Sequence, residues 1–518
     1  MSTPSSAPAA TLADATAADA PATALADAPT AAPTTAHRDA APSRSDAADG
    51  TAARRDALLR AGAAYVAQWI GFQHELRGVP GIQVAIRHRG ELLLDEAWGV
   101  ADATTSEPLT TGHLFRIASH SKTFTATAVL QLVERGTLRL DDPVSRWLPE
   151  LADAEVGPVT VRELLGHQGG VIRDGVVADF WQRGLPFPDG AEILRMAAEE
   201  GRVFAPNEHF KYSNVGYSLL GLVIEAATGR TYGQYVTDEI VRPLGLDDLG
   251  PEWDADRADE YASGHTAALQ AGAPRRVIPH VDTRAMAAAT GWFGTARDLS
   301  AYFAAHAPGE ETLLSEGSRR LLQRRESDIE YAGVLRHYGL GFDVRDLDGA
   351  SLIGHSGGYP GHITRTWLDL DDDIVVSVLT NAIDGPADVL ATGAVGILRL
   401  ALAQLDREPG AADITGRFAS MWSVADLVDL GGALAVLHPA DPDPARSAEV
   451  LEVDADGTLR MPARASFGAS GEPMGVERDD AGEVVSIRLS GMSMWPYDRY
   501  RYALSTEQPS ELLKGMAL

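Results

Sequence analysis

The sequence predicts an α+β fold, in which an antiparallel sheet is packed by helices and a small all-β domain follows. Strand-like segments occur near residue 81 and again between residues 338 and 381, with a long and mostly helical region between them. Short alternating segments fill the chain beyond residue 412. Strands at both ends of a helical region can pair in one sheet, which leaves the helices on its faces and in an inserted lobe.

Residues 1–52 are expected to form a disordered tail. Ala, Thr, Pro, Ser and Asp dominate this segment and large apolar side chains are almost absent. Such a segment cannot bury enough surface to offset the entropy that is lost on ordering. From Asp56 the pattern becomes helical, because Leu58, Val66 and Ile70 fall on one face.

Residues 53–408 are predicted to form the first folded domain. The stretch "GIQVAIRHRGELLLDEAWGV" indicates two strands around a turn at Arg89-Gly90. Four more strands are predicted from "YGLGFDV", "SLIGHSGG", "ITRTWLDL" and "IVVSVLTN", with Asp371-Asp372-Asp373 as a solvated turn between the last two. A closing helix is expected over residues 387–405.

Residues 412–518 are predicted to form a small all-β domain. Segments such as "ALAVLHP", "VLEVDADGTLRM" and "VVSIRLSGMSMW" have the length and alternation of short strands. Hairpin turns such as Asp456-Gly457 separate them. Several short strands in succession are typical of a barrel or a sandwich.

Composition and charge argue against several classes of partner. The formal net charge of −29 at pH 7 disfavours nucleic acid or an anionic membrane surface. Without cysteine the chain has neither a disulfide framework nor a thiolate nucleophile. No apolar run approaches the roughly 20 residues of a membrane span. The N-terminus lacks the basic region and apolar run of a secretory signal, so the chain is interpreted as cytoplasmic, with twin-arginine export through Arg54-Arg55 as the alternative.

The stretch "IASHSKTFTATAVLQLVERG" places Ser119 and Lys122 at the start of an apolar helical pattern. Residues three positions apart lie on one helix face, so the two side chains can meet. The free N–H groups and the dipole of a helix N-terminus favour negative charge on a serine oxygen. Burial lowers the pKa of a lysine, which can then accept a proton, whereas arginine stays protonated. The pattern indicates a catalytic pair, with a helix-capping serine and a surface lysine as the alternative.

Two further segments carry polar motifs. "FKYSNVGYSLLGLVIEAATG" holds Tyr212-Ser213-Asn214 just before an apolar helix, and "LIGHSGGYPGHITRTW" holds His355-Ser356-Gly357 at the end of a strand. Together with Ser-x-x-Lys, in this order, they resemble the serine β-lactamase and penicillin-binding-protein superfamily over about residues 60–405. The resemblance implies a β-lactamase-like catalytic domain.

Within that superfamily, Tyr212 followed by Ser-Asn is similar to class C β-lactamases, DD-peptidases, D-aminopeptidases and β-lactamase-like esterases. His355 stands where true β-lactamases have a lysine. Without that lysine the site lacks a fixed positive charge for a substrate carboxylate. The resemblance therefore implies a peptidase or an esterase rather than an efficient β-lactamase.

The resemblance also implies a role for each motif residue. Ser119 would attack a carbonyl carbon and form an acyl-enzyme, while Lys122 accepts its proton. Tyr212, hydrogen-bonded to both in the family, would pass the proton to the leaving group and later help to activate water. Asn214 would hold the amide of the acyl group or orient Lys122. His355 would act through a hydrogen bond to Tyr212 or to the substrate.

The oxyanion hole is expected from backbone groups. The N–H groups of Ser119 and Gly358 would stabilise the negative oxygen that forms during attack. Ser356, Gly357 and Gly358 would line this part of the site, because glycine permits close approach of the backbone to a ligand.

Two other polar residues near the motifs receive structural interpretations. Arg365 is interpreted as a solvated arginine, with pairing to a substrate carboxylate as the alternative, and His120 is interpreted as a packed histidine. Neither a metal nor an organic cofactor is expected, since no metal-ligand spacing occurs here. The expected partner is a small-molecule or short-peptide substrate, and the oligomeric state stays open.

The region at 412–518 resembles the small lipocalin-like barrel that follows the catalytic domain in some D-aminopeptidases. The stretch "DITGRFASMW" is similar to the entry of such a barrel. The alternative is a packing module without a ligand.

Three functions are consistent with these residues. The leading hypothesis is a serine hydrolase that cleaves an ester or amide through an acyl-enzyme on Ser119. An acyltransferase, including a cyclising thioesterase of penicillin-binding-protein type, would pass the acyl group to an amine instead. A non-catalytic ligand-binding sensor is disfavoured, because such proteins usually lose the serine or the lysine and both are present here.

Overall fold

The computed structural model describes residues 44–269, 273–331, 333–407, 414–463 and 468–506, so the predicted tail lies outside it up to residue 43. Helix α1 (Arg44–Arg77) begins well before Asp56, where the apolar pattern starts. The sequence of its first turns consists mainly of alanine and polar residues. Alanine favours helix, but such a segment has no apolar periodicity from which the helix could be predicted. Gly50–Leu518 form one compact unit, and the proposed boundary at residue 52 stays a prediction.

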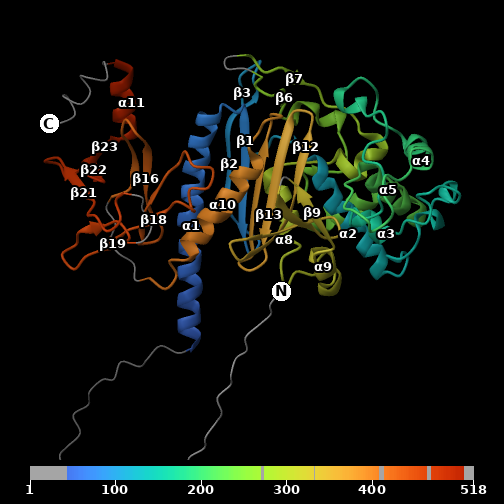
Figure 1. Ribbon diagram of the computed structural model, residues 1–518, viewed down its shortest axis with the longest axis horizontal. Coiled ribbons are helices and arrows are strands. Elements are labelled where there is room, and N and C mark those ends of the chain that lie inside the picture. Colours follow the sequence, from blue (N-terminus) through green and yellow to red (C-terminus); the bar gives the residue numbers. More distant parts are fainter. Residues whose placement is uncertain (1–43, 270–272, 332, 408–413, 464–467, 507–518) are drawn as a thin grey trace, which may run out of the picture. The chain divides into compact units, whose positions relative to one another are not determined.

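The centre of this unit is a nine-stranded antiparallel sheet in the order β3-β2-β1-β14-β13-β12-β11-β10-β9 (Figure 1). Strands from the two ends of the domain meet at the pairing of β1 with β14, as the sequence predicts. Arg89 and Gly90 both have positive φ, which suits the twist of a two-residue hairpin. The strands are β1 (Gly81–His88), β2 (Glu91–Asp102), β3 (Glu107–Pro108), β9 (Ser327–Tyr331), β10 (Val334–Tyr338), β11 (Asp343–Leu347), β12 (Ala350–Tyr359), β13 (His362–Asp369) and β14 (Ile374–Thr380).

Helices cover both faces of this sheet (Figure 1). Val84 of β1 enters the apolar core that α1 and α10 (Ala387–Leu402) share, whereas Ala85 enters the core that contains α2 (Ser121–Glu134). Alternate side chains of one strand point to opposite faces, so β1 is buried on both, and its buried residues include the polar Gln83 and His88 beside apolar side chains. Helix α10 ends at Leu402, slightly before the expected end at residue 405.

The inserted helical lobe uses side-chain caps at its helix starts. Thr160 and Glu163 form a capping box at α3 (Val161–Leu165), and Ser213 caps α5 (Asn214–Thr228). No helix among the described residues is long and apolar enough to cross a membrane. The remaining helices of the domain are α4 (Gly190–Glu199), α6 (Tyr232–Val236), α7 (Arg242–Leu244), α8 (Ala296–Ala304) and α9 (Glu316–Gln323).

Short turns and strands complete the domain. The π-helical turns are η5 (Thr237–Val241) and η8 (Ala287–Gly291). The 3₁₀ turns are η1 (Ala118–His120), η2 (Val144–Arg146), η3 (Pro149–Leu151), η4 (Asp179–Gln182), η6 (Ala255–Glu260) and η7 (Arg284–Met286). Two small sheets pair β4 (Phe115–Arg116) and β5 (Leu249–Gly250) with β8 (Phe293–Gly294), and β6 (Gly264–His265) with β7 (Val277–Ile278).

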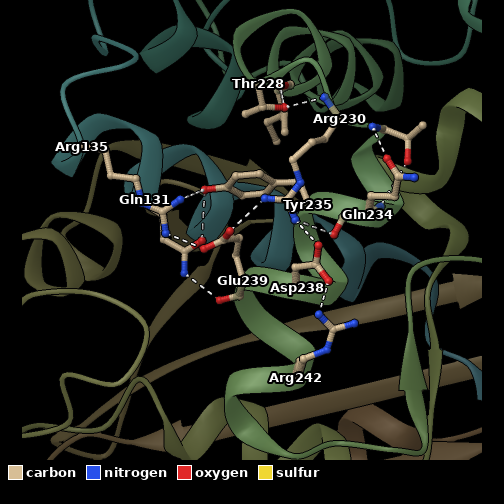
Figure 2. A network of polar contacts seen from close by, with 11 residues as sticks. Gln131, Arg135, Thr228, Arg230, Gln234, Tyr235, Asp238, Glu239 and Arg242 are labelled. Carbon is tan, nitrogen blue, oxygen red and sulfur yellow. Dashed lines mark hydrogen bonds and ion pairs between the residues drawn. The ribbon is translucent and has the colours of Figure 1, made fainter.

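A network of polar contacts joins the C-terminal end of α2 to the turn η5 (Figure 2). Arg135 Nη2 donates to Glu239 Oε2 at 2.6 Å, and Arg230 Nη1 donates to Glu239 Oε1 at 2.9 Å. Arg230 also pairs with Asp238. Because α2 carries Lys122 in its first turn, this network helps to fix the helix that presents that lysine.

The chain beyond residue 414 is rich in sheet, as predicted. Its seven-stranded sheet has the order β18-β17-β16-β15-β23-β22-β21, and Phe418, Leu427 and Ile487 belong to its own apolar core. Helix α11 (Tyr497–Thr506) follows the last strand and was not predicted. The lipocalin-like likeness stays a prediction. The strands of this sheet are β15 (Gly416–Ala419), β16 (Val424–Asp429), β17 (Leu434–Leu437), β18 (Glu449–Val450), β21 (Gly475–Arg478), β22 (Val484–Leu489) and β23 (Met492–Pro496). A separate two-stranded sheet pairs β19 (Glu452–Val453) with β20 (Leu459–Arg460).

Candidate active site

Ser119 lies on the short turn η1, between the strand β4 and the helix α2. The residue before it, Ala118, has a φ of 48°, a left-handed conformation that is uncommon for a residue with a Cβ. Ser119 itself is partly exposed, whereas both of its neighbours are buried. The sharp turn therefore presents the serine hydroxyl while the surrounding backbone is packed into the core, an arrangement in which local strain often accompanies function.

Lys122 is fully buried in the first turn of α2, with 0% of its surface exposed. Its Nζ donates to Asn214 Oδ1 and to the Ala289 carbonyl oxygen, each at 2.8 Å, and lies 3.3 Å from Ser119 Oγ. Burial lowers the pKa of Lys122 well below its usual value, while the nearby Asp174 carboxylate opposes that shift. Lys122 therefore gives up its proton more readily than an exposed lysine does.

Tyr212 packs against both of these residues. Its hydroxyl lies near the Ser119 side chain, and Lys122 Nζ lies 4.6 Å from the centre of its ring. The contacts described for Lys122 include this ring face but no hydrogen bond to the Tyr212 hydroxyl. Burial raises the pKa of Tyr212, although the nearby Ser119 hydroxyl lowers it in part, so the phenol keeps its proton at neutral pH.

Asn214 is the first residue of α5, directly after the capping Ser213. Its Oδ1 accepts from Lys122, and its Nδ2 donates to Asp174 Oδ1 at 2.7 Å. Of the two roles considered for Asn214, the contacts favour the one in which it orients Lys122.

The strand β12 passes beside η1. Strand β11 pairs with β12 only as far as Gly354, so it does not cover the following residues. A Cβ on Gly357 would lie 2.2 Å from the Ile117 carbonyl oxygen, which explains why glycine is needed where the two backbones meet. Ser356 and Gly358 are exposed. An oxyanion hole between Ser119 and Gly358 remains a prediction that suits these positions, since the first N–H groups of a helix lack intrahelical acceptors.

His355 is buried and has other partners than expected. Its Nδ1 donates to the Ser356 carbonyl oxygen at 2.6 Å, so its Nε2 accepts from the Tyr338 hydroxyl at 3.0 Å. Burial lowers the pKa of His355 to about 4, so the ring is neutral at pH 7. A bond from His355 to Tyr212 does not occur among the described contacts, and a bond to the substrate stays a prediction.

The prediction that Arg365 is a solvated arginine is wrong. Its side chain is buried, and Nη1 donates to Asp343 Oδ2 at 2.5 Å. The guanidinium also lies 3.4 Å from the ring centre of Trp367. His120 is packed, as expected, with Nδ1 close to the Ile117 carbonyl oxygen and Thr364 Oγ1.

Three contributors to the site were missed by sequence reasoning. Asp174 contacts Asn214, the ring of His167 lies 4.3 Å from that of Tyr212, and the Ala289 carbonyl accepts from Lys122. His167 lies in the stretch "LGHQGGVIRDG", where a polar residue between glycines could have indicated a site residue. The Ala289 carbonyl could not have been found in this way, because a backbone group does not depend on the residue type. Among the described residues, no group of three His, Asp or Glu side chains is arranged to hold a metal.

Comparison with known sequences agrees with this arrangement. A family model described as Beta-lactamase matches residues 56–397. D-aminopeptidase of Brucella anthropi is 27% identical over 420 residues, which cover 80% of this chain and 72% of that protein. Esterase EstB of Burkholderia gladioli is 37% identical over 191 residues, which cover 34% of this chain and about half, 48%, of that protein.

A solved structure shares the fold. The octameric penicillin-binding protein homologue from Pyrococcus abyssi has a TM-score of 0.59 and 22% identity, and the match covers 83% of this chain and 99% of that one. At this identity the likeness concerns the fold alone, whereas the family match extends over most of the chain. The chain therefore belongs to the β-lactamase family, within the serine β-lactamase and penicillin-binding-protein superfamily, and is a serine hydrolase.

Proposed function

We propose that this hydrolase cleaves an ester or amide bond through an acyl-enzyme on Ser119, with Lys122 as the general base and Tyr212 as the general acid. The observation that carries the proposal is the position of Lys122 Nζ, 3.3 Å from Ser119 Oγ with two carbonyl oxygens at 2.8 Å. A neutral amine has two N–H bonds and one lone pair. When the carbonyls of Asn214 and Ala289 accept the N–H bonds, the lone pair is left for the serine hydroxyl.

Acylation follows from these contacts. Ser119 Oγ attacks the carbonyl carbon of the substrate as its proton moves to Lys122, and the backbone N–H groups of Ser119 and Gly358 stabilise the negative oxygen. Tyr212 then donates its proton to the leaving group, which departs as an alcohol or an amine. The proton that Lys122 accepted then replaces the one that Tyr212 donated, so both groups regain their starting states before deacylation.

Deacylation reverses these roles. A water molecule gives its proton to the neutral Lys122 and attacks the acyl carbon, while the Tyr212 hydroxyl helps to orient it, and the protonated Lys122 returns a proton to Ser119 as the acid product leaves. An amine in place of water would give acyl transfer by the same steps, so competition between water and an amine distinguishes the hydrolase from an acyltransferase.

The substrate class is inferred from charge. His355 is neutral where β-lactamases carry a lysine, and Arg365 is held by Asp343. Neither supplies a free positive charge for the carboxylate of a β-lactam. The relatives named D-aminopeptidase and esterase support short esters or D-amino-acid amides as substrates.

A labelling experiment tests this function. A fluorophosphonate should modify one residue per chain, on the peptide that contains Ser119, and Ser119→Ala should lose both labelling and turnover. Activity is measured in parallel with p-nitrophenyl esters, D-amino-acid amides and a chromogenic cephalosporin. Labelling that persists in Ser119→Ala contradicts the proposal.

A further inference from the structure

Asp174 is a buried carboxylate beside the candidate catalytic groups that the mechanism above does not use. Only 7% of its surface is exposed. Its Oδ1 accepts from Asn214 Nδ2 at 2.7 Å, and its Oδ2 pairs with Arg173 Nε at 3.0 Å. We propose that Asp174 is a positioning residue, which holds the Asn214 amide with its oxygen toward Lys122 and thereby directs the Lys122 lone pair at Ser119. This inference rests on the proposed role of Lys122 as the base.

The chemistry of the two groups fixes the direction of the amide. An asparagine side chain has an acceptor oxygen at one end and a donor NH₂ at the other, and a carboxylate can only accept. The Asn214 NH₂ must therefore face Asp174, which leaves the oxygen facing Lys122. A reversed amide would bring two oxygens together in a buried site and would turn its N–H groups toward the N–H groups of Lys122, and both changes are unfavourable.

Only one of the two carbonyl acceptors around Lys122 is free to turn. The Ala289 carbonyl belongs to the backbone of η8 and cannot rotate. The Asn214 amide can rotate about its side-chain bonds, so its direction depends on its second partner. Asp174 is that partner, and its loss would leave the hydrogen bonds of Lys122 without a defined arrangement.

The loop that carries Asp174 is tied to the same end of α5. The Arg173 carbonyl oxygen accepts from the backbone N–H of Asn214 at 2.9 Å and of Val215 at 3.0 Å. The carboxylate and the amide are thus held at a fixed separation by backbone contacts. The exposed Arg173 side chain covers the other carboxylate oxygen, with 63% of its own surface exposed.

Charge adds a second, measurable consequence. The ionisable groups that face Lys122 are Asp174 and Arg173 on this loop, the neutral histidines His167 and His355, and the phenols Tyr212 and Tyr217. Among these, the Asp174 carboxylate raises the pKa of Lys122, whereas Arg173 lowers it. Removal of the Asp174 charge should therefore move the acid limb of the pH profile, where Lys122 becomes protonated, to lower pH.

The test combines a double-mutant cycle with pH profiles of kcat/KM for a p-nitrophenyl ester. Asp174→Ala should lower kcat/KM by about tenfold or more, and Asn214→Ala should lower it as well. Because Asp174 positions Lys122 through Asn214, the double variant should match Asn214→Ala within about twofold at a pH above the acid limb, where the charge effect on Lys122 no longer changes kcat/KM. If Asp174→Ala lowers activity equally in both backgrounds, or leaves it unchanged in the wild type, the inference is wrong.

The variant Asp174→Asn tests the effect of the Asp174 charge on the pKa of Lys122. It also gives a second result if Asp174→Ala does not fold. It keeps an acceptor for Asn214 but removes the charge, so its acid limb should lie at lower pH than that of the wild type. An unmoved limb overturns the inference. The exposed Asp153→Asn is the matched control, and its profile should coincide with the wild type.

The outcome for Ser119 separates this inference from the proposed function. If Ser119→Ala loses labelling and turnover while the cycle is additive, the inference about Asp174 fails alone. If Ser119→Ala keeps turnover, the proposed function and this inference fall together.

Discussion

Gly357→Ala should disrupt the site by moving β12 away from the turn that holds Ser119. The added Cβ would lie 2.2 Å from the Ile117 carbonyl oxygen and 2.3 Å from Thr364 Oγ1. The two backbones must separate by at least about 1.2 Å before this contact reaches 3.4 Å, where ordinary van der Waals contact begins. Ile117 is two residues from Ser119, so the separation acts directly on the nucleophile and on the oxyanion donors.

A misplacement of about 1 Å can cost about 10²-fold in rate, or about 2.7 kcal/mol of barrier. We therefore expect ester kcat to fall by about two orders of magnitude in Gly357→Ala while the fold survives. The comparison variant is Gly358→Ala, whose Cβ would approach only Ile363 Cδ1, at 3.7 Å. It keeps its N–H and should lose less than about tenfold. Stopped assays of ester kcat with circular dichroism compare the two, and a Gly357→Ala variant as active as Gly358→Ala refutes the steric argument.

Three further predictions address the base, the substrate and the lobe. The ester kcat/KM should rise with pH as Lys122 loses its proton, and this acid limb should lie well below the usual lysine pKa of about 10.4. An acid limb near pH 10 contradicts the role of Lys122 as a buried base with a lowered pKa. Esters should exceed a chromogenic cephalosporin in turnover, and a cephalosporin kcat/KM of about 10⁴ M⁻¹s⁻¹ or more argues against this substrate class. Burial raises the pKa of Glu239, but bonds from Arg135 and Arg230 lower it below its usual value, so Glu239→Gln should lose about 1 kcal/mol of stability at pH 7. That loss should shrink as acid protonates the wild-type carboxylate below about pH 4, and an equal difference in unfolding free energy at pH 3 and pH 7 rules out the charge effect.

The parts of the site that depend on local spacing could be predicted from the sequence. Ser119 and Lys122 lie three residues apart at a helix start, and the observed contact at 3.3 Å follows from that spacing. Tyr212 and Asn214 were found through their motif and its order along the chain. Their contacts with Lys122 required the fold, because Asn214 lies 92 residues from it.

Contacts that depend on strand register could not be predicted. Arg365 pairs across the sheet with Ser356, and His355 pairs with Thr366. Directly opposite residues share a face, so Arg365 and His355 lie on opposite faces, and the arginine reaches Asp343 instead of the site. A shift of one residue in register would have reversed this result.

The fold was predicted where periodicity is strong. The pairing of β1 with β14 and the hairpin at Arg89 follow from apolar runs and turn residues. The start of α1 at Arg44 could not be predicted, because this helix has no clear apolar stripe. Helix α11 was missed because it directly follows a strand and is rich in tyrosine and arginine, with few aliphatic residues.

The central claim is that Lys122 gives up and regains a proton while it contacts Ser119. Ester kcat in Lys122→Arg tests it most directly, because arginine keeps the positive charge but stays protonated, with a pKa above about 12. The account predicts that Lys122→Arg, Lys122→Ala and Ser119→Ala all fall by about 10⁴-fold or more to a similar level, with circular dichroism unchanged. A folded Lys122→Arg variant within about tenfold of the wild type, a barrier change of only about 1.4 kcal/mol, would contradict it.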